Sequence, residues 1–404
     1  MSVTVATSVR CLQEGTGGGT DGGTDGGTKY DNDFSTSGAR NLSDEGTANS
    51  YIVSSAGTYS ISPVKGNSSE PVGSVASAEV LWETFGTDEN IIKGNLISGA
   101  RYENGRIYFK TADAYREGNA VIAAKDANGT ILWSWHIWLT DQPEGHVYNN
   151  NAGTMMDRNL GATSATAGDV GALGLLYQWG RKEPFPRPKD YKFSNNQDEK
   201  VVSSSGSTKI FRYVTAEMVE DQVSAFEFGS KAYAVAYPFT YILGTESNDF
   251  DWLHGEHDAT LWTESDKGKS VNDPCPYGWR VPDGDAFVAF DIDEVEDAAA
   301  VVDVKGMYGW HLVDKSTGIK MFMPGAGRRS YENGVLTNMN NYGFEHNPMP
   351  WIGYYWTAGT ANGNQSKSMF FDLNTTRAVN NRYQAQKTMY RGNGMQVRCV
   401  RDDK

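Results

Sequence analysis

Cys11, Cys275 and Cys399 are the only thiols among the 404 residues of this chain. A thiol can bind a metal, act as a nucleophile or form a disulfide, and its spacing from other thiols separates these uses. None of the three belongs to a Cys-x-x-Cys pair. The spacing therefore excludes zinc ribbons and thioredoxin-type redox sites.

The segment 251–258, DWLHGEHD, is the second group of residues able to do chemistry. His254 and His257 form a His-x-x-His pair beside acidic side chains. On a helix the two imidazoles would share a face, but Gly255 and the polar surroundings favour a loop. Zinc needs at least three protein ligands in fixed geometry. We therefore predict a solvated loop and no cofactor, with Ca²⁺ as a weakly supported alternative because it binds clustered carboxylates and carbonyls.

Other catalytic motifs are absent from the sequence. It contains no Gly-x-Ser-x-Gly elbow and no Gly-rich loop that opens a helix after a strand. Acid pairs occur by chance in a chain with 50 Asp and Glu residues, so glycoside hydrolysis has no specific support. We expect no enzymatic activity, and a glycan-active enzyme is the least favoured alternative.

Charge and hydropathy exclude two further classes of partner. The net charge is −14 and no Lys/Arg cluster is present, whereas phosphate binding needs a basic face, so we exclude nucleic acid. No run of 18 apolar residues occurs, so we predict no transmembrane segment. Residues 1–10 lack the apolar core of a signal peptide, which taken alone would indicate a cytoplasmic protein.

Two boundaries divide the chain. Residues 15–28, GTGGGTDGGTDGGT, cannot bury apolar surface and predict a flexible linker that extends over 15–48. The segment 141–145, DQPEG, is the second boundary, and it separates a region at 49–141 from one at 146–404. Abundant Gly, Trp and Tyr with few helix-forming runs indicate a mainly β or α+β protein rich in loops.

Alternating apolar residues predict a small Ig-like β-sandwich over residues 49–141. Its clearest hairpin joins strands at 119–125 and 130–139 through Asn128-Gly129, which suits a tight turn. Both faces of the second strand are apolar, which indicates a central strand. The other predicted strands are 51–53, 58–61, 79–84 and 106–110.

The region 146–404 has few predicted helices. We expect one at 172–181 and one at 284–290 with Asp283 as its N-cap, and a helix or loop at 216–226. Short strands and long loops account for the remainder.

Five segments of this region carry a resemblance. They are 156–162 (MDRNLGA), 174–185 (GLLYQWGRKEPF), 273–282 (DPCPYGWRVP), 354–357 (YYWT) and 397–400 (VRCV). Their order and spacing over residues 147–401 resemble the Fibrobacter succinogenes major paralogous domain of Bacteroidetes surface proteins. Residues 49–141 resemble the module that often precedes this domain in fimbrillin-like proteins of Bacteroides type.

The resemblance implies a C-type-lectin-like fold, which formylglycine-generating enzymes share. In that fold the first and last strands lie together and long loops cover one end. It also implies export, where oxidation of thiols is favoured, and so a Cys275–Cys399 disulfide across 124 residues. Such a bridge would stabilise by roughly 2–5 kcal/mol. Two buried free thiols are the alternative.

The implied chemistry is binding. Thiols in a framework bridge leave the formylglycine-generating oxidase reaction without a nucleophile. The lectin motifs for Ca²⁺-dependent sugar binding are absent, and Tyr355-Trp356-Thr357 stands where Trp-Asn-Asp would be expected.

The first fourteen residues carry an internal echo. Residues 8–14, SVRCLQE, resemble 396–402, QVRCVRD. We interpret 1–14 as the closing strand of a truncated preceding domain, in which Cys11 has lost its partner. A signal peptide or lipobox would then lie upstream of this chain.

Two sets of residues follow as candidate sites. The first set has a framework role in the motifs, and we expect Arg158 and Arg280 to pair with carboxylates such as Asp157 or Asp273. Its members are Asp157, Arg158, Asn159, Tyr177, Trp179, Trp279, Arg280 and Trp356. Ligand contact is expected between residues 325 and 360, with core packing of several aromatics as the equal alternative. The candidates are Arg328, Arg329, Tyr331, Tyr342, Phe344, His346, Trp351 and Tyr354.

The sequence thus predicts an extracellular or outer-membrane surface protein of fimbrial or adhesive kind. We expect it to bind a glycan or a host or matrix protein, and to contact other pilus subunits. A purely structural surface or pilus module is the main alternative.

Overall fold

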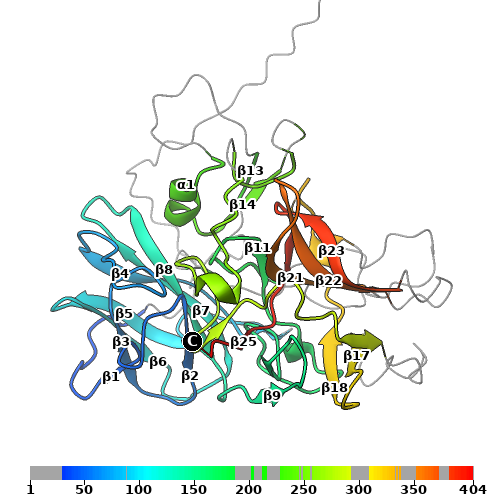
Figure 1. Cartoon of the computed structure of the whole chain (residues 1–404). Helices are drawn as coiled ribbons and strands as arrows, with labels where there is room; N and C mark the ends of the chain where they lie inside the picture. The colour runs from blue at the N-terminus through cyan, green and yellow to red at the C-terminus, as the bar shows by residue number, and fades with distance from the viewer. Residues whose placement is uncertain are drawn as a thin grey trace, which may run out of the picture.

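The computed structural model describes residues 30–87, 89–186, 202–203, 212–215, 228–244, 246, 249–254, 257–292, 309–332, 334, 336–337, 352–372 and 382–403. Over these residues the protein is mainly β, with several small mixed or antiparallel sheets and almost no helix. Figure 1 shows the blue-to-cyan strands of residues 30–141 on one side of the molecule and the orange-to-red strands on the other.

Two sheets contain the described strands that precede residue 141, and the second also takes in a strand from later in the chain. The first has the order β1 (Arg40–Asn41), β3 (Thr58–Ile61), β6 (Arg106–Thr111), β5 (Ile97–Glu103). The second has the order β12 (Val202–Ser203), β4 (Ser77–Thr84), β7 (Gly118–Lys125), β8 (Ile131–Leu139), β2 (Ser50–Val53). Strands of both sheets contribute to one hydrophobic cluster. The predicted strands of this region are confirmed, and β8 is central as predicted, between β7 and β2.

The remaining strands of the described residues form four sheets. A seven-stranded sheet contains β20 (Leu336–Thr337), β19 (Arg328–Arg329), β24 (Gly394–Gln396), β21 (Ile352–Thr360), β22 (Gln365–Asp372) and β23 (Tyr383–Tyr390), with β11 (Leu176–Gln178) paired to β24. A four-stranded sheet joins β15 (Trp279–Arg280), β25 (Val400–Arg401), β10 (Thr154–Met156) and β9 (Gly145–Val147). The smaller sheets are β13 (Arg212–Thr215) with β14 (Thr240–Leu243), and β16 (Phe290–Ile292), β17 (Gly309–Asp314) and β18 (Lys320–Pro324).

Both faces of the β12-β4-β7-β8-β2 sheet are covered. Along β8, Trp133, Trp135 and Ile137 pack into the cluster shared with the first sheet. Trp138 enters a different cluster, which also contains Trp179, Trp356 and the two framework cysteines. The parts before and after residue 141 therefore share a hydrophobic core, which explains why β8 is apolar on both faces.

Neither of the two helices predicted within the described residues forms. The predicted helix at 172–181 is wrong: a 3₁₀ turn at Val170–Ala172 is followed by β11. Gly174 and Gly180 have φ of +70° and +85°, which a right-handed helix cannot accommodate. The helix at 284–290 is also wrong, because residues 284–289 form turns. Asp283 instead accepts bonds from the Ser265 amide and the Arg280 guanidinium.

Short helices occur elsewhere. Helix α1 (Lys231–Ala236) begins at Ser230, whose hydroxyl accepts the Tyr233 amide, and a 3₁₀ turn covers Ser265–Lys267. The predicted helix or loop at 216–226 lies outside the described residues. Within the described structure no helix has the length and hydropathy needed to cross a membrane.

Residues 30–48, predicted to be linker, contact the sheets instead. Tyr30 donates to the buried Glu83 carboxylate at 2.8 Å, and β1 pairs in parallel with β3. Gly99 makes the approach possible, because a Cβ there would lie 1.9 Å from the Asp31 carbonyl oxygen. Residues 1–29, with Cys11, lie outside the described residues.

Candidate functional site

The Cys275–Cys399 disulfide is present and buried. Its Cα atoms are 6.1 Å apart, and both cysteines are 0% exposed. The Asp273 carboxylate accepts the amides of Cys275 and Val281, each at 2.9 Å. Lys269 donates to the carbonyls of Cys275 and Pro276, and burial lowers its pKa to about 8. The bridge thus fastens an ordered turn at 269–281 to the last strand.

Asn49 ties this turn to the sheet before residue 141. Its amide donates to the carbonyls of Val271 and Asp273 at 2.7 and 2.8 Å, and its oxygen accepts Trp133 Nε1 at 3.0 Å. Both side-chain N–H groups of Asn49 are thus directed across the junction, and the bond from Trp133 holds the amide in place on the side of the sheet. The junction is therefore a specific interface rather than a loose linker.

A buried charged group spans the same junction. Lys182 Nζ lies 2.8 Å from Glu183 and donates to the Ser134 carbonyl and hydroxyl, both at 3.0 Å. Arg181 Nε bonds the second Glu183 oxygen at 3.1 Å. Burial lowers the pKa of Lys182; burial also raises that of Glu183, but Lys182 and Arg181 bring it below its ordinary value. The segment 181–183 thus anchors one part of the chain in the other.

Ser50, His136 and Asn119 form a line with the spacing of a catalytic triad. Ser50 Oγ lies 2.8 Å from His136 Nδ1, and His136 Nε2 lies 2.9 Å from Asn119 Oδ1. Burial lowers the pKa of His136 to about 3, which makes it a poor base at neutral pH, and Ser50 is 1% exposed. The Asn119 amide donates onward to the Gly161 carbonyl. We interpret the line as a structural connection between the two parts of the chain.

The expected framework residues are mostly buried, and their two arginines form ion pairs. Arg158 pairs with Asp157 at 2.9 Å and with Asp141. Arg280 pairs with Asp283 at 2.6 Å rather than bonding Asp273. Seven of the eight are buried, and Asp157 is half-buried.

Three motif bonds show how closely the segments meet. Trp356 Nε1 donates to the Tyr177 carbonyl, and Trp179 Nε1 to the Thr357 carbonyl, both at 2.9 Å. Arg398 Nε donates to Asn159 Oδ1 at 2.8 Å. Segments far apart in sequence thus form one bonded frame.

The expected ligand residues divide into three groups. Arg329 and Tyr354 are 2% and 5% exposed, so their side chains belong to the interior. Arg328 and Tyr331 are half-buried and reach the surface. Outside the described residues lie Tyr342, Phe344, His346 and Trp351.

Tyr331 belongs to a cluster of three rings, which we call the aromatic trio: Phe250, Tyr331 and Tyr390. Their centroids are 4.9 Å (Phe250–Tyr331), 4.8 Å (Phe250–Tyr390) and 5.1 Å (Tyr331–Tyr390) apart, and all three are half-buried. Phe250 and its neighbour Asp249 have φ of +60° and +49°. Non-glycine residues rarely adopt this conformation, and such strain concentrates at functional sites.

Polar groups surround the aromatic trio. Arg328 lies 6.0 Å from the Tyr331 ring centroid and bonds Asn393 Oδ1. Asn364 donates to the Asp249 carbonyl at 2.5 Å. Exposed ring surface beside guanidinium and amide groups suits stacking on a sugar or contact with a protein.

His257 lies beside the trio but not in a metal site. Its Nδ1 is 3.0 Å from Asp251 and its Nε2 is 3.4 Å from Asp249. The hydrogen bond that the His257 imidazole donates to the Asp251 carboxylate raises the pKa of His257. Over the described part of the chain, no group of three or more His, Cys, Asp or Glu side chains could hold a metal ion.

Sequence reasoning located Tyr331 but missed Phe250 and Tyr390. These residues come from three separate segments, and no local pattern joins them. Comparison with family models, with curated proteins and with solved structures found no match to this chain.

Proposed function

We propose that this protein is an exported cell-surface binding protein, fimbrial or adhesive in kind, that recognises a glycan and performs no catalysis. The observation that carries the proposal is the aromatic trio: three half-buried rings beside Arg328 and Asn364, with strained backbone at Phe250. Sugar rings have apolar faces that stack on aromatic side chains, while their hydroxyls bond guanidinium and amide groups.

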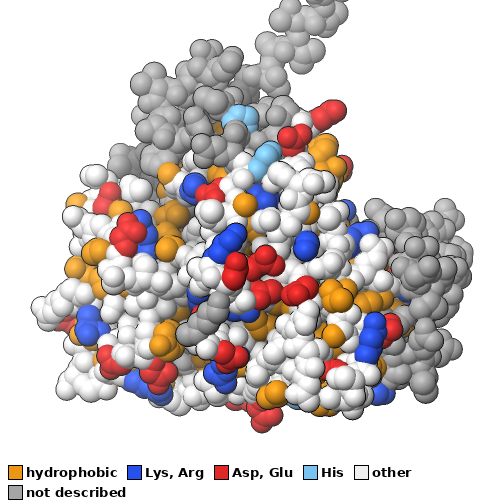
Figure 2. Space-filling model, viewed as in Figure 1, with side chains coloured by type: hydrophobic (Ala, Val, Ile, Leu, Met, Phe, Trp, Pro, Cys, Tyr) orange, Lys and Arg blue, Asp and Glu red, His pale blue; other side chains and the backbone are white. Residues whose placement is uncertain are grey.

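The buried disulfide supports export, because disulfides form and persist in oxidising compartments. In Figure 2 the apolar side chains described on this face lie scattered among charged ones, which suits recognition by a few aromatic residues.

We further propose a specific fold for each of the two parts of the chain. We assign residues 49–141 to an Ig-like sandwich and residues 146–404 to a lectin-like head related to the Fibrobacter succinogenes major paralogous domain. Two observations support the second assignment. The last strand β25 pairs with β10, and β10 with β9, which brings the ends of the region together. The motif segments also bond to one another through Trp356, Trp179 and Arg398.

A glycan array with a parallel panel of matrix proteins tests the proposal. We expect saturable binding of the wild-type chain to a defined set of glycans, and its loss in Tyr390→Ala. Tyr237→Ala is the matched control, because Tyr237 is a surface tyrosine outside the trio, 44% exposed. Binding only to matrix proteins would change the ligand class. No binding at high protein concentration would instead favour a purely structural surface or pilus module.

A further inference from the structure

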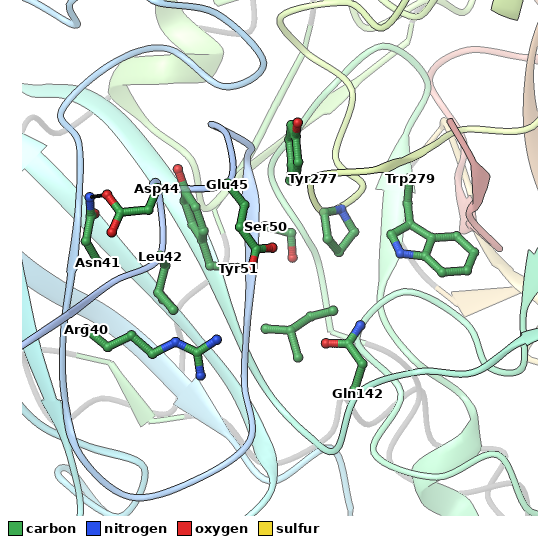
Figure 3. Close-up of a pocket in the computed structure, with 12 residues that line it drawn as sticks. Arg40, Asn41, Leu42, Asp44, Glu45, Ser50, Tyr51, Gln142, Tyr277 and Trp279 are labelled. Carbon is green, nitrogen blue, oxygen red and sulfur yellow. Dashed lines mark hydrogen bonds between the residues drawn. The ribbon is translucent and has the colours of Figure 1, made fainter. Parts of the chain in front are cut away.

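A pocket of about 310 Å³ lies between residues 40–52 and the turn that carries Cys275. Its lining comes from β1 and the residues after it, from β2, from Gln142, and from Pro276 to Trp279 (Figure 3). Both parts of the chain build it, so its shape depends on the junction held by Asn49. The volume lies within the usual range of small-molecule sites.

Tyr277 and Trp279 supply the aromatic wall. Tyr277 is 55% exposed, and its ring rests on Gly46, where a Cβ would lie 2.0 Å from Tyr277 Cε2. Trp279 is 3% exposed and is held by the Arg401 guanidinium 4.3 Å from its ring centroid. Figure 3 shows the indole nitrogen of Trp279 turned toward the pocket. This nitrogen makes no hydrogen bond within the described structure.

Three exposed polar side chains face the same space. Figure 3 shows Arg40, Glu45 and Gln142 reaching toward the pocket from different segments. Among the described residues, none of the three has a hydrogen bond or an ion pair through its side chain. Asp44 differs, since its carboxylate accepts the Asn41 amide. The groups that can meet a ligand therefore include one guanidinium, the two carboxylates of Asp44 and Glu45, the Gln142 amide and one indole N–H.

We propose that this pocket binds a saccharide of one or two sugar units. Among the lining residues, Arg40 carries a positive charge and Asp44 and Glu45 carry negative charges, so the net charge of −1 disfavours an anionic ligand. The lining also places donors and acceptors beside apolar surface from Leu42 and Ile52. A ligand with many hydroxyls and an apolar ring face satisfies both features, with the face on Tyr277 and the hydroxyls on Glu45, Arg40, Gln142 and Trp279 Nε1. The pocket shares no residue with the aromatic trio.

Saturation-transfer NMR and calorimetry with the full chain test this assignment. The probes are glucose, galactose, mannose, N-acetylglucosamine and their β-linked disaccharides, with free amino acids as a zwitterionic comparison. Glu45→Gln should weaken saccharide binding by about tenfold, the usual effect of losing a hydrogen bond to a charged group. Gly46→Ala should weaken it similarly, because its Cβ displaces Tyr277 without removing a polar group.

Asp33→Asn is the matched control, since Asp33 is an exposed carboxylate outside the pocket, and it should bind as the wild type does. Thermal melting verifies that each variant folds, and Arg40→Ala replaces Gly46→Ala if that variant does not.

Three results would overturn the inference: no saccharide binding at millimolar concentration, binding of amino acids instead, or unchanged affinity in Glu45→Gln. Saccharide binding lost in Tyr390→Ala but kept in Glu45→Gln would place the ligand at the trio, which rejects the pocket and leaves the proposed function intact.

Discussion

Acid should destabilise this protein through His136. Burial lowers the pKa of its imidazole from 6.5 to about 3. The Asn119 amide nitrogen faces the Gly161 carbonyl, so Asn119 Oδ1 faces His136 Nε2 and accepts its proton. His136 Nδ1 then accepts the Ser50 hydroxyl. The neutral ring is fully bonded, and a second proton would have to displace the Ser50 proton.

The direction and the magnitude of this destabilisation follow from the linkage between protonation and folding. Between pH 6.5 and 3 the unfolded chain protonates His136 and the folded protein does not, so stability is present above pH 6.5 and is lost as the pH falls. With these two pKa values, the loss is about 1.4 kcal/mol at pH 5.5 and about 2 kcal/mol at pH 5. Other titratable groups also make the stability depend on pH, but a variant that lacks the His136 imidazole keeps those groups. The difference between the wild type and this variant therefore isolates the contribution of His136.

The assay is chemical unfolding of wild type and His136→Gln at pH 8 and pH 5.5. The wild-type chain should lose about 1.4 kcal/mol more than the variant between these pH values. His146→Gln is the control, because His146 is exposed, and it should lose as much as the wild type. Equal losses in wild type and His136→Gln would refute the reasoning, as would an NMR titration showing a charged His136 at pH 5.

Further predictions concern the disulfide and the buried charges. The pair Cys275→Ala and Cys399→Ala should lower the free energy of unfolding by roughly 4–5 kcal/mol, because the bridge closes a separation of 124 residues; a loss below about 1 kcal/mol in denaturant titration would contradict this. Lys182→Met should lower the free energy of unfolding by about 3 kcal/mol, because Glu183 loses an ion-pair partner and the Ser134 carbonyl loses a hydrogen-bond donor. Lys231→Met, which removes an exposed ion pair to Asp258, should cost less than about 1 kcal/mol; equal costs would show that burial is not the cause.

Features with a local signal could be predicted from the sequence. Alternation with a period of two located β2, β3, β4, β6, β7 and β8, and Asn128-Gly129 located the hairpin turn, where Gly129 has φ +83°. Strand β5 was missed because ISGARYE alternates poorly and contains Gly99. The false helix at 172–181 followed a helical spacing of apolar residues that Gly174 and Gly180 interrupt.

The aromatic trio and the pocket depend on tertiary contacts, so the sequence carries little local signal for either. The aromatic trio joins Phe250, Tyr331 and Tyr390, which no sequence window contains together. The junction pocket uses residues 40–52, which composition assigned in large part to a linker. Short polar segments carry no apolar periodicity, so only their contacts with the sheets reveal that they are part of the fold.

Calorimetric titration of the strongest array glycan into the full chain tests whether the aromatic trio binds a glycan. We expect saturable binding that Tyr331→Ala and Tyr390→Ala each weaken by about tenfold or more, as expected for aromatic contact residues. Tyr237→Ala should retain the wild-type affinity. Affinity unchanged in both trio variants, or no heat of binding with any array glycan, would contradict the claim that the aromatic trio is a glycan-binding surface.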